Sequence, residues 1–452
     1  MKALWYFPAV FSRTNAKSVR TAPTLFFLAG ILLLSMACQT RHSRDIDSLY
    51  LPDVNTLFED YDQLDSTGAY AAYADKLVQA NRDLQASELY VEAASLYEQA
   101  GNLDSVALLL HMAIDRGMAN PNILRRLHVK QQSGPVWERL QKRLDSIQKQ
   151  LENVANFDLK MEAMTSFWPY LEQALQDSTQ AKRLFKEYIF SGPREIRDFY
   201  AVRYYSTEAM YGQMINAAPH YYRYLRHQFD PKRLLALRDK TREGMERFQE
   251  LYPQAVFPSV FVVPGILNSG GTVTEMGLFV GGDLYGKSAE MPTEELTEWQ
   301  KDAIMEASSL PSLTLHELMH FQQNYNDPKN TDNVLYGLIQ EGVCDFLVEL
   351  CTGETLKNKN LTYLEEPGHR EKIISDLRED LFSNDLSKWL YNGGSIQDRP
   401  SDLGYTLGYL ITKSYYKNQK DKKMAVYELL NSKDLERIVK RSAYAYLLSP
   451  ST

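Results

Sequence analysis

The apolar positions divide the chain into two stretches with different periodicity. From residue 39 to about residue 250, apolar side chains recur mostly at helical spacing. After the proline-bounded segment 253–258, two short β-branched and aromatic runs follow at 260–263 and 277–281, with turn residues between them. The pattern predicts a mostly helical α+β protein. Its helical region covers residues 39–250, and a second region with a small sheet covers 251–452.

The stretch 84–121 carries small and apolar residues near the spacings of a tetratricopeptide-like helix pair. The positions are Ala94, Tyr97, Gly101, Leu103, Leu110 and Ala113, and Asn120-Pro121 marks the end. Because a free-standing solenoid usually needs three or more repeats, we expect the pair to pack on neighbouring helices. Two roles stay open for it: a docking surface for a protein partner, or a spacer from a membrane.

The first 38 residues have the pattern of a secretory signal. Four cations and no acidic residue precede an apolar core over residues 25–34, which is too short for a comfortable membrane span. The core ends in Ser35-Met36-Ala37-Cys38, which resembles a lipobox, the site where a bacterial diacylglyceryl group is attached to cysteine. Ser35 departs from the usual Leu, so cleavage by an ordinary signal peptidase after Ala37 stays an alternative. We expect a lipid anchor on Cys38 and a place in the cell envelope, facing the periplasm or the cell surface.

The charge balance argues against a nucleic-acid partner. Removal of the leader with its four cations would change the net charge from −8 to −12, and no basic stripe with interleaved aromatic residues is present. The two cysteines beyond Cys38 are Cys344 and Cys351. At two helical turns apart their Cα atoms would be separated by about 10 Å, beyond disulfide reach, so we expect buried thiols.

The run His316-Glu317-Leu318-Met319-His320 carries the clearest chemical signal. On a helix, His316 and His320 project from one face, close enough for both imidazoles to bind a single Zn²⁺. Glu317 lies to their side, where its carboxylate can take a proton from a water activated by the metal. Ser309 is the expected N-cap of this helix. The spacing therefore predicts a zinc hydrolase site with Glu317 as the general base.

A second helix is predicted over the apolar-periodic stretch 335–350. Glu341 and Asp345 are four residues apart and share one face of it. Glu341 can supply the third zinc ligand that a catalytic site needs, and Asp345 can accept the free N–H of a ligand histidine. Two solvated carboxylates on a surface helix would be the alternative, but the flanking Leu338 and Phe346 favour burial.

At this point the chain resembles the gluzincin peptidases, in which His-Glu-x-x-His is followed by Glu-x-x-x-Asp on a second helix. More narrowly, HELMHFQQ at 316–323, QEGVCD at 340–345 and the upstream NSGGT at 268–272 look like a family of motif-assigned zinc-dependent proteases related to bacterial gliding-motility lipoproteins. The resemblance covers roughly the chain from Pro258 onward. It implies a gluzincin-like fold, peptidase activity, and a strand near the glycine-rich turn that binds the substrate backbone. An ordinary hairpin stays the alternative for that segment.

Gluzincins also place a Tyr, His or Arg opposite the zinc to stabilise the oxyanion. Tyr405, in a helical segment that begins near Leu403, is our first candidate, followed by Tyr409 and Arg399. His369, in a predicted turn, is held in reserve. Because the chain contains 29 tyrosines, any one of them is more often a packing residue than a catalytic one.

One further motif points elsewhere. The segment 281–288, GGDLYGKS, satisfies the phosphate-loop pattern and follows a predicted strand. A phosphate loop needs a helix that begins at its lysine, and Pro292 interrupts the chain a few residues later. We therefore do not expect nucleotide binding there.

The sequence thus predicts a membrane-anchored zinc metallopeptidase that hydrolyses peptide bonds of a peptide or protein substrate. His316, His320 and Glu341 would bind Zn²⁺, Glu317 and Tyr405 would be catalytic, and Asp345 would orient a ligand histidine. The alternative is a non-catalytic envelope lipoprotein that binds partners in a gliding or assembly apparatus. An intact carboxylate at Glu317 favours catalysis, because a structural zinc site does not need one.

Overall fold

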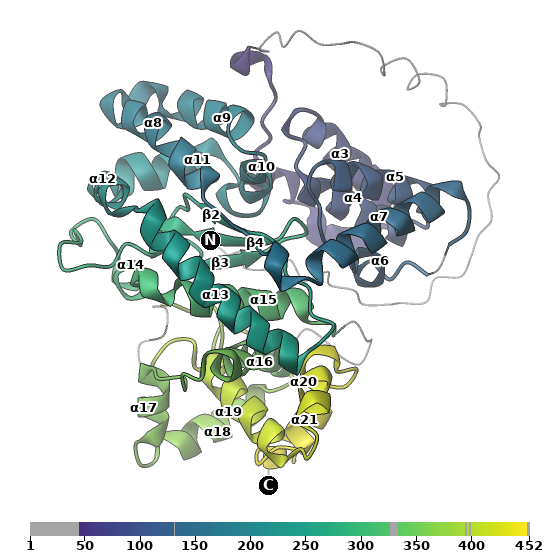
Figure 1. Ribbon diagram of the computed structural model, residues 1–452, viewed down its shortest axis with the longest axis vertical. Helices are drawn as coiled ribbons and strands as arrows, with labels where there is room; N and C mark the ends of the chain where they lie inside the picture. Colours follow the sequence, from purple (N-terminus) through teal and green to yellow (C-terminus); the bar gives the residue numbers. More distant parts are fainter. Residues whose placement is uncertain (1–44, 131, 326–332, 394–395, 397–398, 450–452) are drawn as a thin grey trace. The chain divides into compact units, whose positions relative to one another are not determined.

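Helices make up most of the chain, and one small sheet lies among them (Figure 1). The computed structural model describes residues 45–130, 132–325, 333–393, 396 and 399–449. From Tyr50 onward the chain forms one compact unit, which is the part considered below. The predicted mostly helical α+β class is confirmed. The predicted leader and Cys38 lie outside the described residues.

The first helices surround an apolar core of their own. The longer ones are α3 (Tyr70–Leu84), α4 (Ser87–Gln99), α5 (Leu103–Asp115) and α7 (Pro135–Leu151), and the short ones are α1 (Val54–Leu57), α2 (Leu64–Thr67) and α6 (Ile123–Arg126). The predicted helix pair corresponds to α4 and α5, which pack on each other and are joined by a short turn with Gly101 at φ +73°. Its kinship with tetratricopeptide repeats stays a prediction.

The next segment adds one edge strand to the sheet and a series of helices, some of which pack on it. It consists of strand β1 (Leu159–Lys160), the helices α8 (Glu162–Gln176), α9 (Ala181–Ser191), α10 (Glu195–Phe199), α11 (Thr207–Tyr211), α12 (Pro219–Gln228) and α13 (Pro231–Leu251), and the π-helical turns η5 (Tyr200–Tyr204) and η6 (Gly212–Ala217). Phe199 stacks on Phe279 of the sheet at 5.5 Å between ring centroids, and α8 packs on strand β2. The predicted boundary near residue 250 stays a prediction, although β1 and its helices lie against strands from beyond it.

The sheet has the strand order β1-β2-β4-β3. Strands β1, β2 (Val260–Val263) and β4 (Leu278–Gly281) are parallel, and β3 (Gly271–Val273) pairs antiparallel with β4 at the edge. The sequence predicted β2 and β4 but treated the glycine-rich segment between them as a turn. In the structure part of that segment is strand β3, because the connection must return the chain so that β4 can run parallel to β2.

The remaining helices carry the predicted site. They are α14 (Glu298–Ala303), α15 (Leu310–Gln322), α16 (Val334–Thr352), α17 (Lys359–Glu365), α18 (His369–Asp380), α19 (Leu403–Asn418), α20 (Lys422–Asn431) and α21 (Glu436–Lys440). Helix α15 packs against β3 and β4 on one side and α16 on the other. Helices α16 and α19 touch through glycines, since an ideal Cβ on Gly342 would lie 2.0 Å from the carbonyl carbon of Gly408. This close contact fixes the position of α16.

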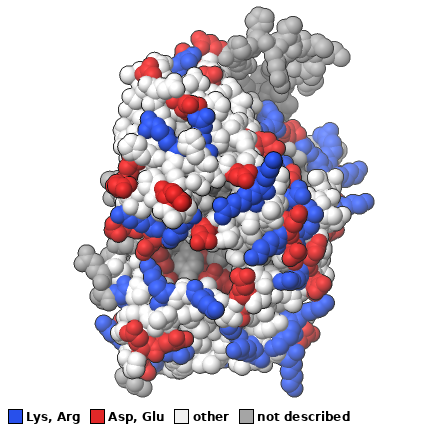
Figure 2. All heavy atoms as spheres, turned by 60° about the vertical axis from the view of Figure 1, so that its left-hand side comes forward, with Lys and Arg blue, Asp and Glu red and all other residues white. Residues whose placement is uncertain are grey.

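The surface carries both signs of charge. Figure 2 shows Lys and Arg interspersed with Asp and Glu over the face that it presents. The expectation that no nucleic acid binds stays a prediction. Within the described part of the chain, none of the helices has both the length and the apolar character needed to cross a bilayer.

Candidate metal centre

Helix α15 presents the two predicted histidine ligands on one face. His316 and His320 are one turn apart, and their Nε2 atoms lie 3.1 Å from each other. Pro311 occupies the first turn, where its missing N–H costs nothing. Ser309 occupies the N-cap position as predicted, but its side chain makes no capping hydrogen bond.

Helix α16 brings Glu341 to the same point. Its Oε2 atom lies 3.2 Å from Nε2 of His316 and 3.2 Å from Nε2 of His320. All three side chains are largely buried. Three donor atoms from two helices therefore form a nearly equilateral triangle with edges of 3.1–3.2 Å.

The size of this triangle can be compared with what zinc requires. For a tetrahedral ion with ligand distances of about 2.0–2.1 Å, neighbouring donor atoms are separated by about 3.3–3.4 Å. The observed edges are within about 0.3 Å of that value, and two imidazole nitrogens with one carboxylate oxygen are a zinc-hydrolase donor set. The residues present therefore fit a zinc ion.

Each histidine is also held through its other ring nitrogen. His316 Nδ1 lies 2.9 Å from Oδ1 of Asp345, and His320 Nδ1 lies 3.0 Å from Oε1 of Gln323. The Gln323 amide is itself fixed, because its Nε2 donates to the carbonyl oxygen of Gln340 at 2.7 Å. Acceptors at both Nδ1 positions keep the proton there and leave each Nε2 lone pair free for a cation.

Cys344 offers a second possible ligand set. His316, His320 and Cys344 have candidate ligand atoms within 4.8 Å of one another and could also hold a metal ion. The Cys344 sulfur, however, lies 3.4 Å from Nδ1 of His320, the nitrogen that faces away from Glu341. Burial raises the pKa of the Cys344 thiol well above its usual value, with neighbouring carboxylates adding to the shift. The sulfur thus lies beside the outer nitrogen of His320 and not beside the two Nε2 atoms that face Glu341, so the set with Glu341 fits a metal better.

The charges of this cluster favour a cation. Burial by itself lowers the pKa of His316, but its contacts with Asp345 and Glu341 outweigh burial and raise that pKa well above its usual value. Burial also disfavours the charged form of Glu341, yet the charges and hydrogen bonds of His320 and His316 lower its pKa. The field that holds protons on the imidazoles without a metal would equally stabilise a divalent cation between them.

Glu317 lies against the edge strand. An ideal Cβ on Gly271 of β3 would be 2.4 Å from Oε1 of Glu317 and 2.5 Å from its Cγ, so only glycine leaves room for this side chain. Burial raises the pKa of the Glu317 carboxyl, while the charges of the two histidines and of Arg203 oppose the shift. Arg203, on the π-helical turn η5, donates from Nε to Oγ1 of Thr272 at 2.6 Å. The carboxylate is thus confined between β3 and the histidine face of α15.

Two tyrosines lie close to Glu341. The Tyr391 hydroxyl donates to Oε1 of Glu341 at 2.6 Å, and the Tyr405 ring packs edge-on against Tyr391 with centroids 6.0 Å apart. Burial, followed by the charges of Glu341, Asp402 and other nearby carboxylates, raises the pKa of Tyr405 well above its usual value. Tyr405 therefore lies within electrostatic reach of the site, and Tyr391 touches a predicted ligand directly.

The segment that carries Tyr391 is fastened by a reciprocal pair of hydrogen bonds. The backbone N–H of Asn392 donates to Oδ1 of Asp402 at 2.9 Å, and the N–H of Asp402 donates to Oδ1 of Asn392 at 2.8 Å. Tyr391 and Asp402 both have positive φ, at 55° and 58°, which is unusual for residues other than glycine. These two hydrogen bonds hold Tyr391 in this conformation beside Glu341.

The other candidates for the oxyanion are engaged elsewhere. The Tyr409 hydroxyl bonds to Glu349 and Lys413, two turns along α16 from Glu341. Arg399 donates to the carbonyl oxygen of Lys388 at 2.7 Å. His369 begins helix α18 instead of lying in a turn, and its ring stacks on Tyr363 at 4.1 Å.

The structure thus brings His316, Glu317, His320, Glu341, Asp345 and Tyr405 into one cluster. Sequence reasoning missed Gln323, Tyr391 and Arg203. Gln323 directly follows the last residue of α15 and is only three residues from His320, so its closeness in sequence was a usable signal. The sequence carried no such signal for Tyr391 or Arg203, because only contacts between distant segments bring them to the site.

Comparison with known proteins agrees with this geometry. A family model described as predicted Zn-dependent protease (DUF2268) matches residues 295–436, which is less than half of the chain and includes α15 and α16. No curated protein matches the chain, and no solved structure does. The matched segment is therefore similar to a family of predicted zinc-dependent proteases, and it contains the whole cluster of candidate metal ligands.

Proposed function

We propose that this protein is a zinc-dependent metallopeptidase of gluzincin type. The observation that carries the proposal is the triangle of Nε2 of His316, Nε2 of His320 and Oε2 of Glu341, with edges of 3.1–3.2 Å. The family match supports the coarser assignment as a zinc-dependent protease. The finer assignment rests on the donor set and on its outer partners Asp345 and Gln323.

Each residue has a distinct chemical task in this proposal. Zinc, when held by His316, His320 and Glu341, would lower the pKa of water and polarise the scissile carbonyl. Glu317 would accept a proton at its carboxylate and return it to the leaving amine, which requires that it start ionised. Burial raises its pKa and so makes it a stronger base, while the positive charges of Arg203 and of a bound zinc ion would favour the ionised form.

Substrate binding and charge stabilisation complete the proposal. We propose that an extended peptide lies along the free edge of β3, beside Glu317, with its backbone paired to the strand. Tyr405 would donate a hydrogen bond to the oxyanion. Tyr391 would hold Glu341 through its 2.6 Å hydrogen bond and so keep the other carboxylate oxygen directed at the two histidines.

Anchoring is a separate part of the proposal. The signal-like first 38 residues and the lipobox-like sequence ending at Cys38 support a protein that is lipid-anchored in the bacterial envelope, facing the periplasm or the cell surface. The N-terminal helices, including the pair α4 and α5, would then lie on the chain between the anchor and the peptidase. We also propose that a protein partner binds to this helical half.

The second candidate function is a non-catalytic envelope lipoprotein with a structural metal. Burial of Glu317 against Gly271 disfavours it, because a structural site gains nothing from a buried carboxylate confined beside the ligands. Substitution of Glu317 by Gln distinguishes the two functions, since Gln keeps the shape of the side chain but cannot act as a base. We expect the variant to retain zinc and lose hydrolysis of a quenched-fluorescent peptide library by at least 100-fold. Full activity in this variant would refute the proposed mechanism.

A further inference from the structure

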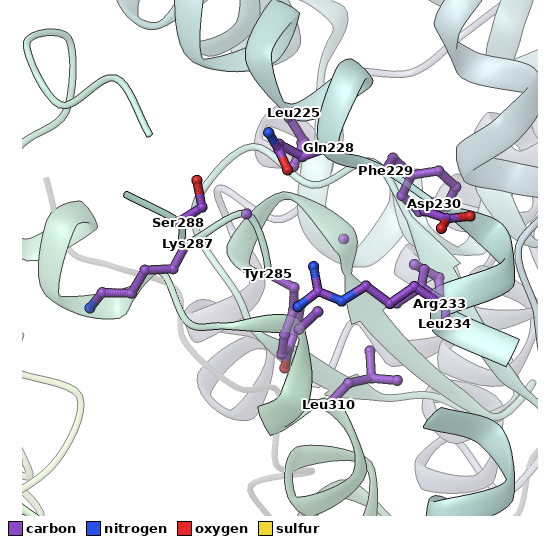
Figure 3. A pocket seen from close by; sticks show the side chains of 14 residues that line it. Leu225, Gln228, Phe229, Asp230, Arg233, Leu234, Tyr285, Lys287, Ser288 and Leu310 are labelled. Carbon is purple, nitrogen blue, oxygen red and sulfur yellow. The ribbon is translucent and has the colours of Figure 1, made fainter. Parts of the chain in front are cut away.

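A pocket separate from the metal centre lies beyond the carboxyl end of strand β4. Its empty volume is about 530 Å³, part of it open to solvent, and its lining includes none of the candidate metal ligands (Figure 3). The walls come from the end of α12, the first turn of α13, strand β2, the loop after β4 and the start of α15. This position, outside the carboxyl ends of parallel strands, is a common place for ligands in α/β sheets.

The lining has an apolar floor and a polar mouth. The floor is formed by buried side chains, among them Leu225, Leu234, Val262 and Leu310. Exposed polar and charged side chains form the mouth, namely Gln228, Asp230, Arg233 and Lys287. A ligand that fits both parts has an apolar body and one polar or charged end.

Arg233 is the charged group directed into the pocket. In Figure 3 its guanidinium reaches toward the centre of the pocket, whereas the amine of Lys287 points outward. Within the described residues the Arg233 side chain has no hydrogen bond or ion pair. The carboxylate of Asp230, which also lines the pocket, caps α13. Its Oδ1 accepts a hydrogen bond from the backbone N–H of Lys232 at 2.9 Å. A planar guanidinium at the mouth matches a carboxylate, which it can bind through two parallel hydrogen bonds.

Tyr285 adds a second, independent sign of a ligand. Its side chain is buried and lines the pocket, yet its hydroxyl has no hydrogen-bond partner among the residues that the structure describes. A buried hydroxyl without a partner is unfavourable, and a polar atom of a ligand would relieve it. The pocket thus contains a guanidinium at its mouth and an unsatisfied hydroxyl among its apolar walls.

The phosphate-loop-like segment contributes to this pocket in another way. Gly282, Gly286, Lys287 and Ser288 all belong to the lining. As expected from the sequence, no helix begins at Lys287, because residues 285–297 contain none, and the backbone N–H of Lys287 donates to Met305. Without a helix start there is no cradle of amides for phosphates, so a nucleotide is not the ligand that fits.

We propose that this pocket binds a small carboxylate with an apolar body. The carboxylate would pair with Arg233, and the body would lie on Leu225, Leu234 and Leu310. Two sources share this chemistry: an apolar C-terminal residue of a peptide, and a free carboxylic acid. The inference goes beyond the proposed peptidase function and does not depend on it.

Isothermal titration of the purified protein tests the proposal. N-acetyl-phenylalanine represents the peptide source and 3-phenylpropionate the free acid, and the amide of each is the neutral reference. We expect at least one carboxylate to bind at least tenfold more tightly than its amide. Arg233→Gln should remove that preference, and Tyr285→Phe should weaken binding several-fold. Arg238→Gln, on the same helix but paired with Asp239 and outside the pocket, should bind as the wild type does.

The possible results distinguish the two sources of the carboxylate. Binding of N-acetyl-phenylalanine alone assigns the pocket to peptide C-termini, and binding of 3-phenylpropionate alone assigns it to free acids. Equal affinity for acid and amide, unchanged affinity in Arg233→Gln, or no binding at millimolar concentration would overturn the proposal. The titration needs no catalysis, so a failed peptidase proposal would leave this result intact. Circular dichroism and zinc content of each variant confirm that fold and metal centre are unchanged.

Discussion

Gly271→Ala is a sharp probe of the position of Glu317. A Cβ at this position would lie 2.4 Å from Oε1, 2.5 Å from Cγ and 2.6 Å from Cδ of Glu317. An ordinary contact needs at least 3.4 Å, so the carboxylate must move by about 1 Å, and a misplacement of that size costs about 100-fold in rate. This corresponds to about 2.7 kcal/mol of transition-state stabilisation. The three metal ligands are untouched, so zinc content should stay near that of the wild type.

The neighbouring glycine supplies a matched control. An ideal Cβ on Gly270 meets nothing closer than 3.6 Å, so Gly270→Ala should keep close to wild-type kcat/KM. Both variants are assayed on a quenched-fluorescent peptide that the wild type cleaves, with metal content measured by mass spectrometry on the same samples. Wild-type kcat/KM in Gly271→Ala, or an equal loss in Gly270→Ala, would refute the placement of Glu317 as the base beside β3.

Three other predictions address the scaffold. Gly342→Ala puts a Cβ 2.0 Å from the backbone of Gly408, so α16 and α19 must separate. We expect the free energy of unfolding, measured in urea, to fall by about 1–3 kcal/mol and zinc binding to weaken. An unchanged unfolding midpoint would contradict this. Tyr391→Phe removes the hydrogen bond to Glu341 and should weaken zinc about 10-fold in a competition titration with a chelator, while equal affinity would show that the bond is unimportant. Burial raises the pKa of Asp198 to about 8, so the folded protein holds a proton that the unfolded chain releases near pH 4; stability from this group is present below pH 4 and falls as the pH rises to 8. Asp198→Asn should therefore reduce the loss of unfolding free energy between pH 6 and 8 by about 2 kcal/mol, and an unchanged pH slope would count against this assignment.

The candidate metal centre could be predicted from the sequence because the spacing of its residues is local. His316 and His320 share one helix face whatever surrounds them. Glu341 and Asp345 are also four residues apart, so they share a face of a second helix. Only the approach of α15 to α16 needed the fold, and their apolar faces make that packing favourable. The structure places Oδ1 of Asp345 2.9 Å from Nδ1 of His316, and the role of Asp345 in orienting this histidine stays a prediction.

The remaining parts depended on contacts between distant segments. Strand β1 is two residues long and pairs with β2 about 100 residues later, so its own sequence carries no strand signal. Tyr391 reaches Glu341 from a strained segment closed by Asn392 and Asp402, which no periodicity indicates. The segment at 271–273 has the composition of a turn and becomes a strand because pairing with β4 satisfies its backbone.

The central claim is that His316, His320 and Glu341 together hold zinc. The most direct measurement is the zinc content of the purified protein and of the variants Glu341→Ala and Cys344→Ser, by mass spectrometry after dialysis against a weak chelator. We predict about one zinc per chain in the wild type and in Cys344→Ser, and little or none in Glu341→Ala. Zinc retained in Glu341→Ala but lost in Cys344→Ser would contradict the ligand set, and a wild-type protein without zinc would contradict the account as a whole.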